Sequence, residues 1–431
     1  MAQDTTKADA VLQDHYLPLF QEMVNQRAIM LFGYTPDELE AGFGTANASK
    51  GETMDYRGIV RDADQFEFAG RKWVWAAHVG RNESGTMRSL EGATLPTPGE
   101  QKYEDFNGTL KYAVKQIEIS GFAMEIAERN AAVFVNLLTG ETEGVTNDLR
   151  KDLNRQSYGN ETGALCSITA DGANTVTVDS VQYLRVGMYV DAVDSNDDSV
   201  DMSNRKITAI NQSTKVVTYD GANVDLATDS SVKLCVTGNW KKELTGLESI
   251  TNSTTYPNLF GVNASTAGNE WWQSVRVDGG AGTFDEDLAQ QLLDQVGESG
   301  YETELIITTR GIRRRYVNTL KAQKRWNDGN AGKLHGGFKY IDFNDYPMIY
   351  DDTAPKGKTW FIRPSDFVWI WLNNNDFRWL NRDGRILRKV ESPDQDQWRA
   401  TIYRYNELAV KRRNCQGQMY NLADDSARVL T

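Results

Sequence analysis

Hydrophobic and polar positions alternate in several separate runs of this chain, a pattern typical of half-buried β-strands. One run covers residues 66–77 and includes Trp73 and Trp75, and a second extends from Thr109 to Ser120. Between them, residues 80–101 are rich in Gly, Pro, Ser and Asn, which form turns. We therefore predict a long β-hairpin within residues 60–120. An isolated two-stranded ribbon is only marginally stable in water, so the hairpin should lie on another surface, such as that of a neighbouring subunit.

Short β-type runs also fill residues 165–238, where Asp-Gly and Asp/Asn-rich turns separate them. This segment contains no Trp and no Glu, and its ten Asp against five Lys and Arg give a net charge of −5. Strands at this spacing predict a small β-barrel or sandwich. The abrupt changes in composition at both ends suggest a module inserted into a host domain.

Helical periodicity dominates two stretches of the first half of the chain. Residues 1 to about 32 carry apolar side chains at helical spacing and predict an arm. Residues 122–158 have an apolar face as well, and we expect this helical stretch to stop at Gly159.

Helices and strands alternate in residues 245–395, which predicts an α/β or α+β domain. Thr283-Phe-Asp-Glu286 has the pattern of a capping box that opens a helix. Leu305–Thr308 is an apolar run typical of a buried strand, and a helix with Ile312 and Tyr316 on its inner face should follow. The final segment, from Trp398 to Asn421, alternates again.

Composition narrows the class of protein. The chain has 431 residues, of which 40% are hydrophobic and 25% charged, as expected for two or three packed modules. Its net charge of −13 disfavours a protein whose main task is to grip nucleic-acid phosphates, because those contacts need clustered Lys and Arg. It suits a container that holds DNA without adhering to it. No run approaches 18 apolar residues, so we expect no membrane contact.

Candidate chemistry is sparse. The three histidines are isolated, no Cys/His spacing fits a metal, and neither a P-loop nor a GxSxG elbow occurs. Asp351-Asp352 is an adjacent pair that could serve a hydrolytic site, and the Asp/Asn run at 194–198 is EF-hand-like in composition only. The widely spaced Cys166, Cys235 and Cys415 favour buried thiols in a reducing cytoplasm over a disulfide. We predict no catalytic residues, no metal and no cofactor, and thus no enzyme.

Two residue classes leave alternatives open. The eleven tryptophans could stack on sugars or could form core and subunit contacts, and the basic cluster at 310–325 could contact DNA, solvent or a neighbour's carboxylates. We favour core and subunit contacts for the tryptophans, and a solvated helix face or contacts with a neighbour's carboxylates for the basic cluster. The candidate inter-subunit residues are Trp73, Trp75, Arg81, Glu83, Arg88, Arg313, Arg314 and Arg315.

Three stretches, taken in order, carry a resemblance to a known family. Residues 148–159 with Thr162–Leu165 look like the end of a spine helix and its Gly-containing exit. Asp345–Pro355 looks like a passage of the axial domain, and Tyr403–Val410 looks like a late strand that returns to the peripheral domain. Together with the arm and the hairpin, this order resembles the major capsid proteins of tailed bacteriophages, whose fold encapsulins share.

The resemblance implies an α+β chain with the tailed-phage major capsid fold and an inserted all-β module. The implied parts are an N-terminal arm (1–59), an extended β-hairpin loop (60–120), a peripheral domain with the spine helix (121–164), the inserted barrel or sandwich (165–238), an axial domain (239–395) and a return strand with the C-terminus (396–431).

The implied function is self-assembly into the icosahedral capsid shell that encloses the double-stranded DNA genome of a tailed phage. The implied partners are further copies in pentamers and hexamers, a separate scaffolding protein, a portal, a possible decoration protein, and packaged DNA bound without sequence specificity. The location would be the virion capsid, after assembly in the host bacterial cytoplasm. The alternatives are an encapsulin-like nanocompartment and a Trp-rich carbohydrate-binding or tail-surface protein.

Overall fold

A computed structural model gives the structure of the chain. It describes residues 67–85, 87, 96–121, 144–145, 148–149, 151–222, 224–226, 231–323, 341–344, 346–372, 378–381, 384, 386–389 and 396–424. The predicted N-terminal arm, Arg88, residues 324–325 of the basic cluster and most of the predicted helical stretch 122–158 lie outside these residues. The described end of that stretch is helical at residues 151–157 and stops before Gly159, as expected.

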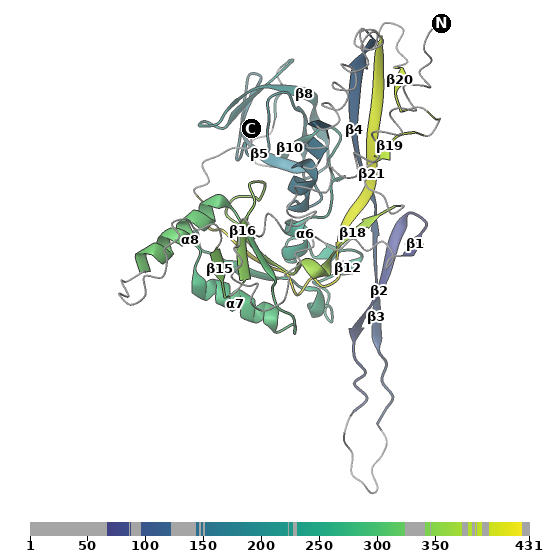
Figure 1. Ribbon diagram of the computed structural model, residues 1–431, viewed down its shortest axis with the longest axis vertical. Coiled ribbons are helices and arrows are strands. Elements are labelled where there is room, and N and C mark those ends of the chain that lie inside the picture. The colour runs from purple at the N-terminus through teal and green to yellow at the C-terminus, as the bar shows by residue number, and fades with distance from the viewer. Residues whose placement is uncertain are drawn as a thin grey trace, which may run out of the picture.

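The hairpin consists of β1 (Glu67–Ala69), β2 (Lys72–Gly80) and β3 (Lys102–Thr109), arranged in that order. β2 and β3 are antiparallel, with register partners from Lys72↔Thr109 to Gly80↔Lys102. Figure 1 shows both strands running away from the other described elements. The second limb is therefore Lys102–Thr109, and the expected limb Thr109–Ser120 was wrong.

Residues expected in the second limb form part of a different sheet. β4 (Lys111–Ser120) pairs along its whole length with β21 (Gln397–Val410), from Lys111↔Asn406 to Ser120↔Gln397. Alternation fixes which face of a strand is buried but does not select its partner, and β21 offers the matching apolar face. The other side of β21 pairs with β18 (Phe367–Trp371), β19 (Arg378–Trp379) and β20 (Arg388–Lys389).

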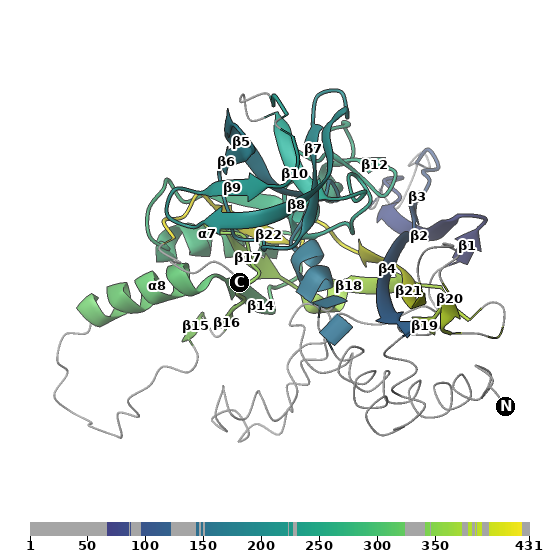
Figure 2. The ribbon, with the colours of Figure 1, turned by 90° about the horizontal axis from the view of Figure 1, so that it is seen from above.

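Residues 164–236 form a closed six-stranded barrel with a core of its own. Its strands are β5 (Ala164–Gly172), β6 (Thr175–Val178), β7 (Tyr189–Asp194), β8 (Val200–Asn211), β9 (Val216–Tyr219) and β10 (Val232–Val236), and they close in the order β10-β5-β6-β9-β8-β7. Closure leaves no unpaired edge. Ile168, Val232 and Leu234 are fully buried in it. Figure 2 shows the barrel as a compact unit beside the remaining sheets.

A six-stranded mixed sheet forms the other large unit. It consists of β13 (Val275–Asp278), β22 (Gly417–Tyr420), β17 (Thr359–Ile362), β14 (Leu305–Thr308), β16 (Tyr346–Tyr350) and β15 (Ile341–Phe343), in that order. All four side chains of β14 are buried, as its apolar run predicts.

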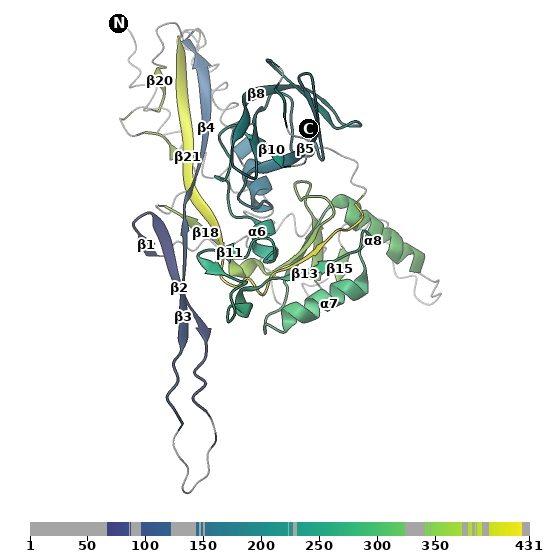
Figure 3. The ribbon, with the colours of Figure 1, turned by 180° about the vertical axis from the view of Figure 1, so that it is seen from behind.

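Two helices share one apolar core with this sheet. α7 (Glu286–Gly297) packs on β13 and β22, and α8 (Arg310–Gln323) packs near β16, as Figure 3 shows from behind. Ile312 and Tyr316 of α8 face inward, as predicted. The N-cap of α7 is Asp285, whose side chain accepts from Asp287 N at 2.9 Å, so the predicted capping box beginning at Thr283 was placed two residues early.

Short elements fill the junction between these units: α6 (Leu247–Thr251), β11 (Asn258–Leu259), β12 (Val262–Asn263) and the 3-10 turns η2 (Glu270–Trp272) and η3 (Pro364–Asp366). They cover the inner side of the hairpin base and contribute to the largest apolar core.

Candidate functional site

The base of the hairpin is anchored within its own subunit. Trp73 is 1% exposed and packs edge-on against Phe260 with ring centroids 5.1 Å apart. The ring of Phe106, which lies opposite Trp75 on β3, has its centroid 4.5 Å from that of Trp272. Gly108 is required here, because a Cβ at that position would lie 2.6 Å from the Trp73 ring. Trp73 thus offers almost no surface to a neighbour, and its expected role in inter-subunit contact gives way to one in the core.

Trp75 occupies an intermediate position at the same base. Its ring stacks on Phe106 at 5.1 Å and remains half-buried. It is the nearer of the two tryptophans to the surface, so an inter-subunit contact of Trp75 stays a prediction.

Beyond its base the hairpin exposes its side chains. Arg81 Nε donates to Glu83 Oε1 at 2.6 Å, and both groups are open to solvent, with side-chain exposures of 81% and 72%. The hydrogen bond and the opposite charge lower the pKa of Glu83 and raise the pKa of Arg81. Met87 is 94% exposed and Tyr103 66%. The described residues of this part of the hairpin are held by local contacts and form no apolar core, so their side chains are available to another molecule.

The predicted basic residues of α8 gather at the carboxyl ends of β14 and β16. Arg310 Nη2 donates to Asp352 Oδ2 at 2.6 Å, and the guanidiniums of Arg310 and Arg313 lie 4.8 and 5.1 Å from the centre of the Tyr350 ring. Arg314 is exposed and Arg315 half-exposed. The structure therefore brings Arg313, Arg314 and Arg315 together on the helix, far along the chain from the hairpin residues.

Sequence reasoning missed an aromatic patch on the outward face of the β4–β21 ribbon. Tyr112 stacks on Tyr405 at 4.8 Å, and Tyr403 meets Tyr405 edge-on at 5.7 Å. Beside them, Val114 is 43% exposed and Leu372 is also 43% exposed. An exposed group of aromatic and aliphatic side chains on a flat sheet is typical of protein contact surfaces. The alternation of β4 could have revealed it, because Tyr112 and Val114 occupy the face opposite Ile117 and Ile119.

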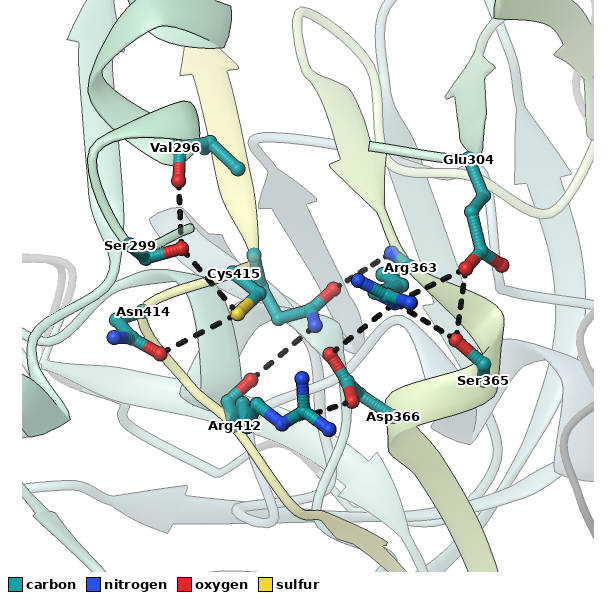
Figure 4. Close-up of polar contacts among 10 residues, drawn as sticks. Val296, Ser299, Glu304, Arg363, Ser365, Asp366, Arg412, Asn414 and Cys415 are labelled. Carbon is teal, nitrogen blue, oxygen red and sulfur yellow. Dashed lines mark hydrogen bonds and ion pairs between the residues drawn. The ribbon is translucent and has the colours of Figure 1, made fainter. Parts of the chain in front are cut away.

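A charged cluster joins the end of β17, η3 and the segment after β21 (Figure 4). Arg363 pairs with Glu304 at 3.0 Å, and Arg412 pairs with Asp366 at 3.5 Å. Burial raises the pKa of Asp366, although both arginines oppose that effect. The Tyr301 ring lies 3.7 Å from the Arg412 guanidinium and 5.0 Å from that of Arg363. The charges largely compensate one another, so the cluster acts as a structural clamp.

Cysteine chemistry is disfavoured by the surroundings of the thiols. All three cysteines are free and buried, as predicted. Burial raises the pKa of Cys415, and Ser299 Oγ lies 3.5 Å from its sulfur. Burial likewise raises the pKa of Cys235 to about 12. A thiol that stays protonated at neutral pH is a poor nucleophile.

The adjacent carboxylates Asp351 and Asp352 do not form a shared site. Asp351 is buried and accepts from Tyr158 Oη and Asn154 Nδ2, each at 2.8 Å, whereas Asp352 pairs with Arg310. The next residues of the loop hold the barrel, since Gln182 Nε2 donates to the Ala354 carbonyl at 2.9 Å and Tyr183 Oη to the Thr353 carbonyl at 2.9 Å. The loop of residues 351–354 therefore links the helical residues 151–157, the barrel and the six-stranded sheet.

Neither a metal site nor a membrane-spanning helix is evident in the part of the chain that the structure describes. There, no three His, Cys, Asp or Glu side chains are grouped so that they could hold a metal ion. Within the same residues, no helix has the length and apolar character needed to span a membrane.

Comparison with solved structures identifies the fold. One chain of the cyanophage A-1(L) capsid asymmetric unit matches with a TM-score of 0.50 at 11% identity, over 90% of this chain and 99% of that chain. The chain has the tailed-phage capsid fold. No protein-family model matches it, and no curated protein matches it by sequence.

Further matches to solved structures have lower TM-scores. A chain of Mycobacterium phage Bobi matches with a TM-score of 0.42 at 9% identity, covering 88% of this chain and 97% of that one. A chain of the holo-SrpI encapsulin complex from Synechococcus elongatus PCC 7942 matches with 0.38 at 10% identity, covering 83% and 84%.

The capsid fold accounts for the mixture of elements seen here. Among the described residues the chain is an α+β arrangement, as the sequence predicted, and it has many strands and few helices. In this fold the projecting hairpin, the aromatic patch and the basic start of α8 are three separate exposed surfaces on one chain.

Proposed function

We propose that the chain is the shell-forming subunit of a tailed-phage capsid and works by self-assembly. The observation that carries the proposal is the hairpin. β2 and β3 extend away from the body, only their base is packed, and Tyr103 and Met87 beyond it are exposed. A ribbon of this kind gains stability by lying on another chain. The likeness to the cyanophage capsid chain over 90% of the sequence supports the same conclusion.

The physical mechanism is the addition of several modest interfaces. A specific interface buries on the order of 1,000 Å² or more, and each subunit of a closed shell shares several. The exposed hairpin and the aromatic patch supply two surfaces of suitable chemistry. Symmetric repetition of such contacts yields a shell that holds even though each contact alone is weak.

The finer assignments belong to the same proposal. Residues 1–59 would form the arm, 60–120 the extended loop region, 121–164 the peripheral domain, 165–238 the inserted module, 239–395 the axial domain and 396–431 the return strand. The shell would consist of pentamers and hexamers and would enclose double-stranded DNA. The net charge of −13 fits a wall that does not adhere to phosphates. A scaffolding protein, a portal and a decoration protein would be its partners, with assembly in the host cytoplasm.

Electron microscopy of the expressed full chain tests the proposal. The chain is produced with and without its candidate scaffolding protein, sedimented and negatively stained. We expect closed shells, sheets or tubes built of regular rings. Only monomers to trimers under both conditions would refute the shell function.

An encapsulin-like compartment is the alternative within the same fold. It predicts closed shells that co-purify with one cargo protein and contain no DNA. Nuclease-protected double-stranded DNA inside particles from infected cells would decide for the phage shell.

The carbohydrate-binding alternative loses support from the burial of the tryptophans. Five of the tryptophans that the structure describes are buried and present no open ring face to a sugar: Trp73, Trp272, Trp360, Trp369 and Trp379. Saturable sugar binding by a small discrete oligomer would be needed to restore it.

A further inference from the structure

Charge is segregated between the two helices that cover one face of the six-stranded sheet. Residues 283–304, which contain α7, include seven acidic and no basic side chains, whereas α8, residues 310–323, includes five basic and no acidic side chains. α7 packs on β13 and β22, and α8 packs near β16, toward the other end of the sheet. The sheet is five strand spacings wide, roughly 24 Å. The subunit thus has an acidic end and a basic end.

The acidic residues of α7 form a stripe on its outer face. Asp287, Asp294 and Glu298 are exposed, and their spacing of seven and four residues places them on one side of the helix. Among the described residues, none of the three forms an ion pair. Asp294 accepts one hydrogen bond, from Gln290 Nε2 at 2.6 Å. We call this set the acidic stripe.

The basic end is built on the first turns of α8. Arg310 and Arg314 are exposed, and Arg313 and Arg315 are half-exposed. These side chains also have contacts within the subunit, such as the pair of Arg310 with Asp352. The helix itself nevertheless carries an excess of positive charge, since residues 310–323 include no acidic side chain. Asn318, one turn after Arg314, is exposed beside them.

Asp294 and Glu298 in α7, and the arginines that begin α8, lie where the dipole of their own helix disfavours their charge, whereas Asp287 lies in the first turn of α7, where the dipole favours it. The last turn of α7 has no basic residue, and Asp294 and Glu298 lie near its C-terminus, the negative end of the dipole. The first turn of α8 has no acidic residue and begins with Arg310, at the positive end of the dipole. Each of these charges weakens its own helix slightly, unless a charge of opposite sign from another molecule offsets it.

We propose that the occupant of each end is a second copy of this chain, so that the acidic stripe of one subunit contacts the basic start of α8 in the next. A contact between two different surfaces of identical subunits is heterologous and closes into a ring when the rotation permits. Complementary charge fixes the orientation of the subunits and disfavours like-to-like pairing. This inference rests on the proposed shell function and names the surfaces that join neighbours within one ring.

Charge reversal at each end, separately and together, tests the pairing in the full chain. Asp294→Lys with Glu298→Lys makes the stripe basic, and Arg314→Glu with Asn318→Glu adds acid to the basic end. Each variant should raise the subunit concentration needed for assembly roughly tenfold, because like charges then meet. The variant with all four substitutions should return to near the wild-type concentration. Asp201→Lys with Asp225→Lys, on exposed barrel positions, is the control with the same charge change as the stripe variant.

Sedimentation velocity and negative-stain microscopy provide the readout, and thermal unfolding of the unassembled subunit checks folding. A wild-type chain that never assembles would refute the shell function itself. Assembly of either end variant at the concentration that suffices for the barrel control would overturn the pairing while leaving the shell function intact. Failure of the four-substitution variant, with its fold preserved, would also overturn it. Rescue establishes the pairing even if one end variant folds poorly.

Discussion

Glu407 provides a sharp test of the packing at the base of the β4–β21 ribbon. Its side chain is 2% exposed and accepts from Thr245 N at 2.8 Å and Leu408 N at 3.0 Å. Burial raises the pKa of Glu407 to about 8, and Glu161 adds to this effect. The two hydrogen bonds and Lys111 oppose it. The carboxyl group is therefore protonated in the folded chain at neutral pH.

The pH dependence follows from the difference between the two states. An unfolded glutamate ionises near pH 4.5, so the unfolded chain loses this proton over a range in which the folded chain keeps it. Stability then falls as pH rises from about 4.5 to about 8 and is constant above. At about 1.4 kcal/mol per pKa unit, the loss is about 3 kcal/mol at pH 7 and about 5 kcal/mol above pH 8.

Glu407→Gln removes this loss. The amide oxygen can accept the same two hydrogen bonds and its NH₂ group replaces the carboxyl proton, while nothing ionises. Urea unfolding of the unassembled subunit at pH 5, 7 and 9 should show the variant gaining stability over wild type as pH rises, by several kcal/mol at pH 9. Glu100→Gln, at an exposed position, should show no such divergence. A Glu407→Gln difference that is the same at all three pH values would refute the reasoning.

Three further substitutions test the interior. Arg413→Lys should lower the free energy of unfolding by about 3 kcal/mol in thermal melts, because the buried guanidinium donates to the carbonyls of Ser249, Ile250 and Tyr256 at 2.7–2.8 Å and an ammonium cannot reproduce that fork. An effect as small as that of Arg71→Lys, at an exposed position, would contradict this. Trp73→Ala should destabilise the subunit by about 3–5 kcal/mol through a cavity, whereas Tyr103→Ala, on the exposed part of the hairpin, should leave the melting temperature unchanged. Asp351→Ala should lower the free energy of unfolding by about 2–3 kcal/mol, because Tyr158 and Asn154 lose the carboxylate that accepts their hydrogen bonds. Faster proteolysis between the barrel and the sheet should accompany this loss. An unchanged cleavage rate would show that the loop does not hold the barrel.

Local pattern predicted the elements of this chain better than their partners. The fully buried β14 and the inner face of α8 were evident because apolar spacing directly reports burial. The pairing of β4 with β21 was not, because the two strands are separated by almost 280 residues and alternation carries no information about which strand lies opposite.

The candidate site shows the same division. Trp73 was expected at a subunit contact because an aromatic residue in a long hairpin suits an interface as well as a core. Only the fold places Phe260 against it. Arg81 and Glu83 are exposed, and their inter-subunit contact stays a prediction, whereas the segregation of charge between α7 and α8 needed the strand order of the sheet.

The closure of the barrel has a consequence for how this gene could change. The chain enters at β5 and leaves at β10, and these two strands are hydrogen-bonded neighbours, with Ala164 opposite Cys235. The whole module therefore joins the rest of the subunit at two points that already lie side by side, as the ends of a short loop do. Keeping these ends together costs the folded subunit little additional conformational entropy. A foreign domain with adjacent termini could be exchanged for it, and the remaining fold would require only that the new ends meet at the same spacing.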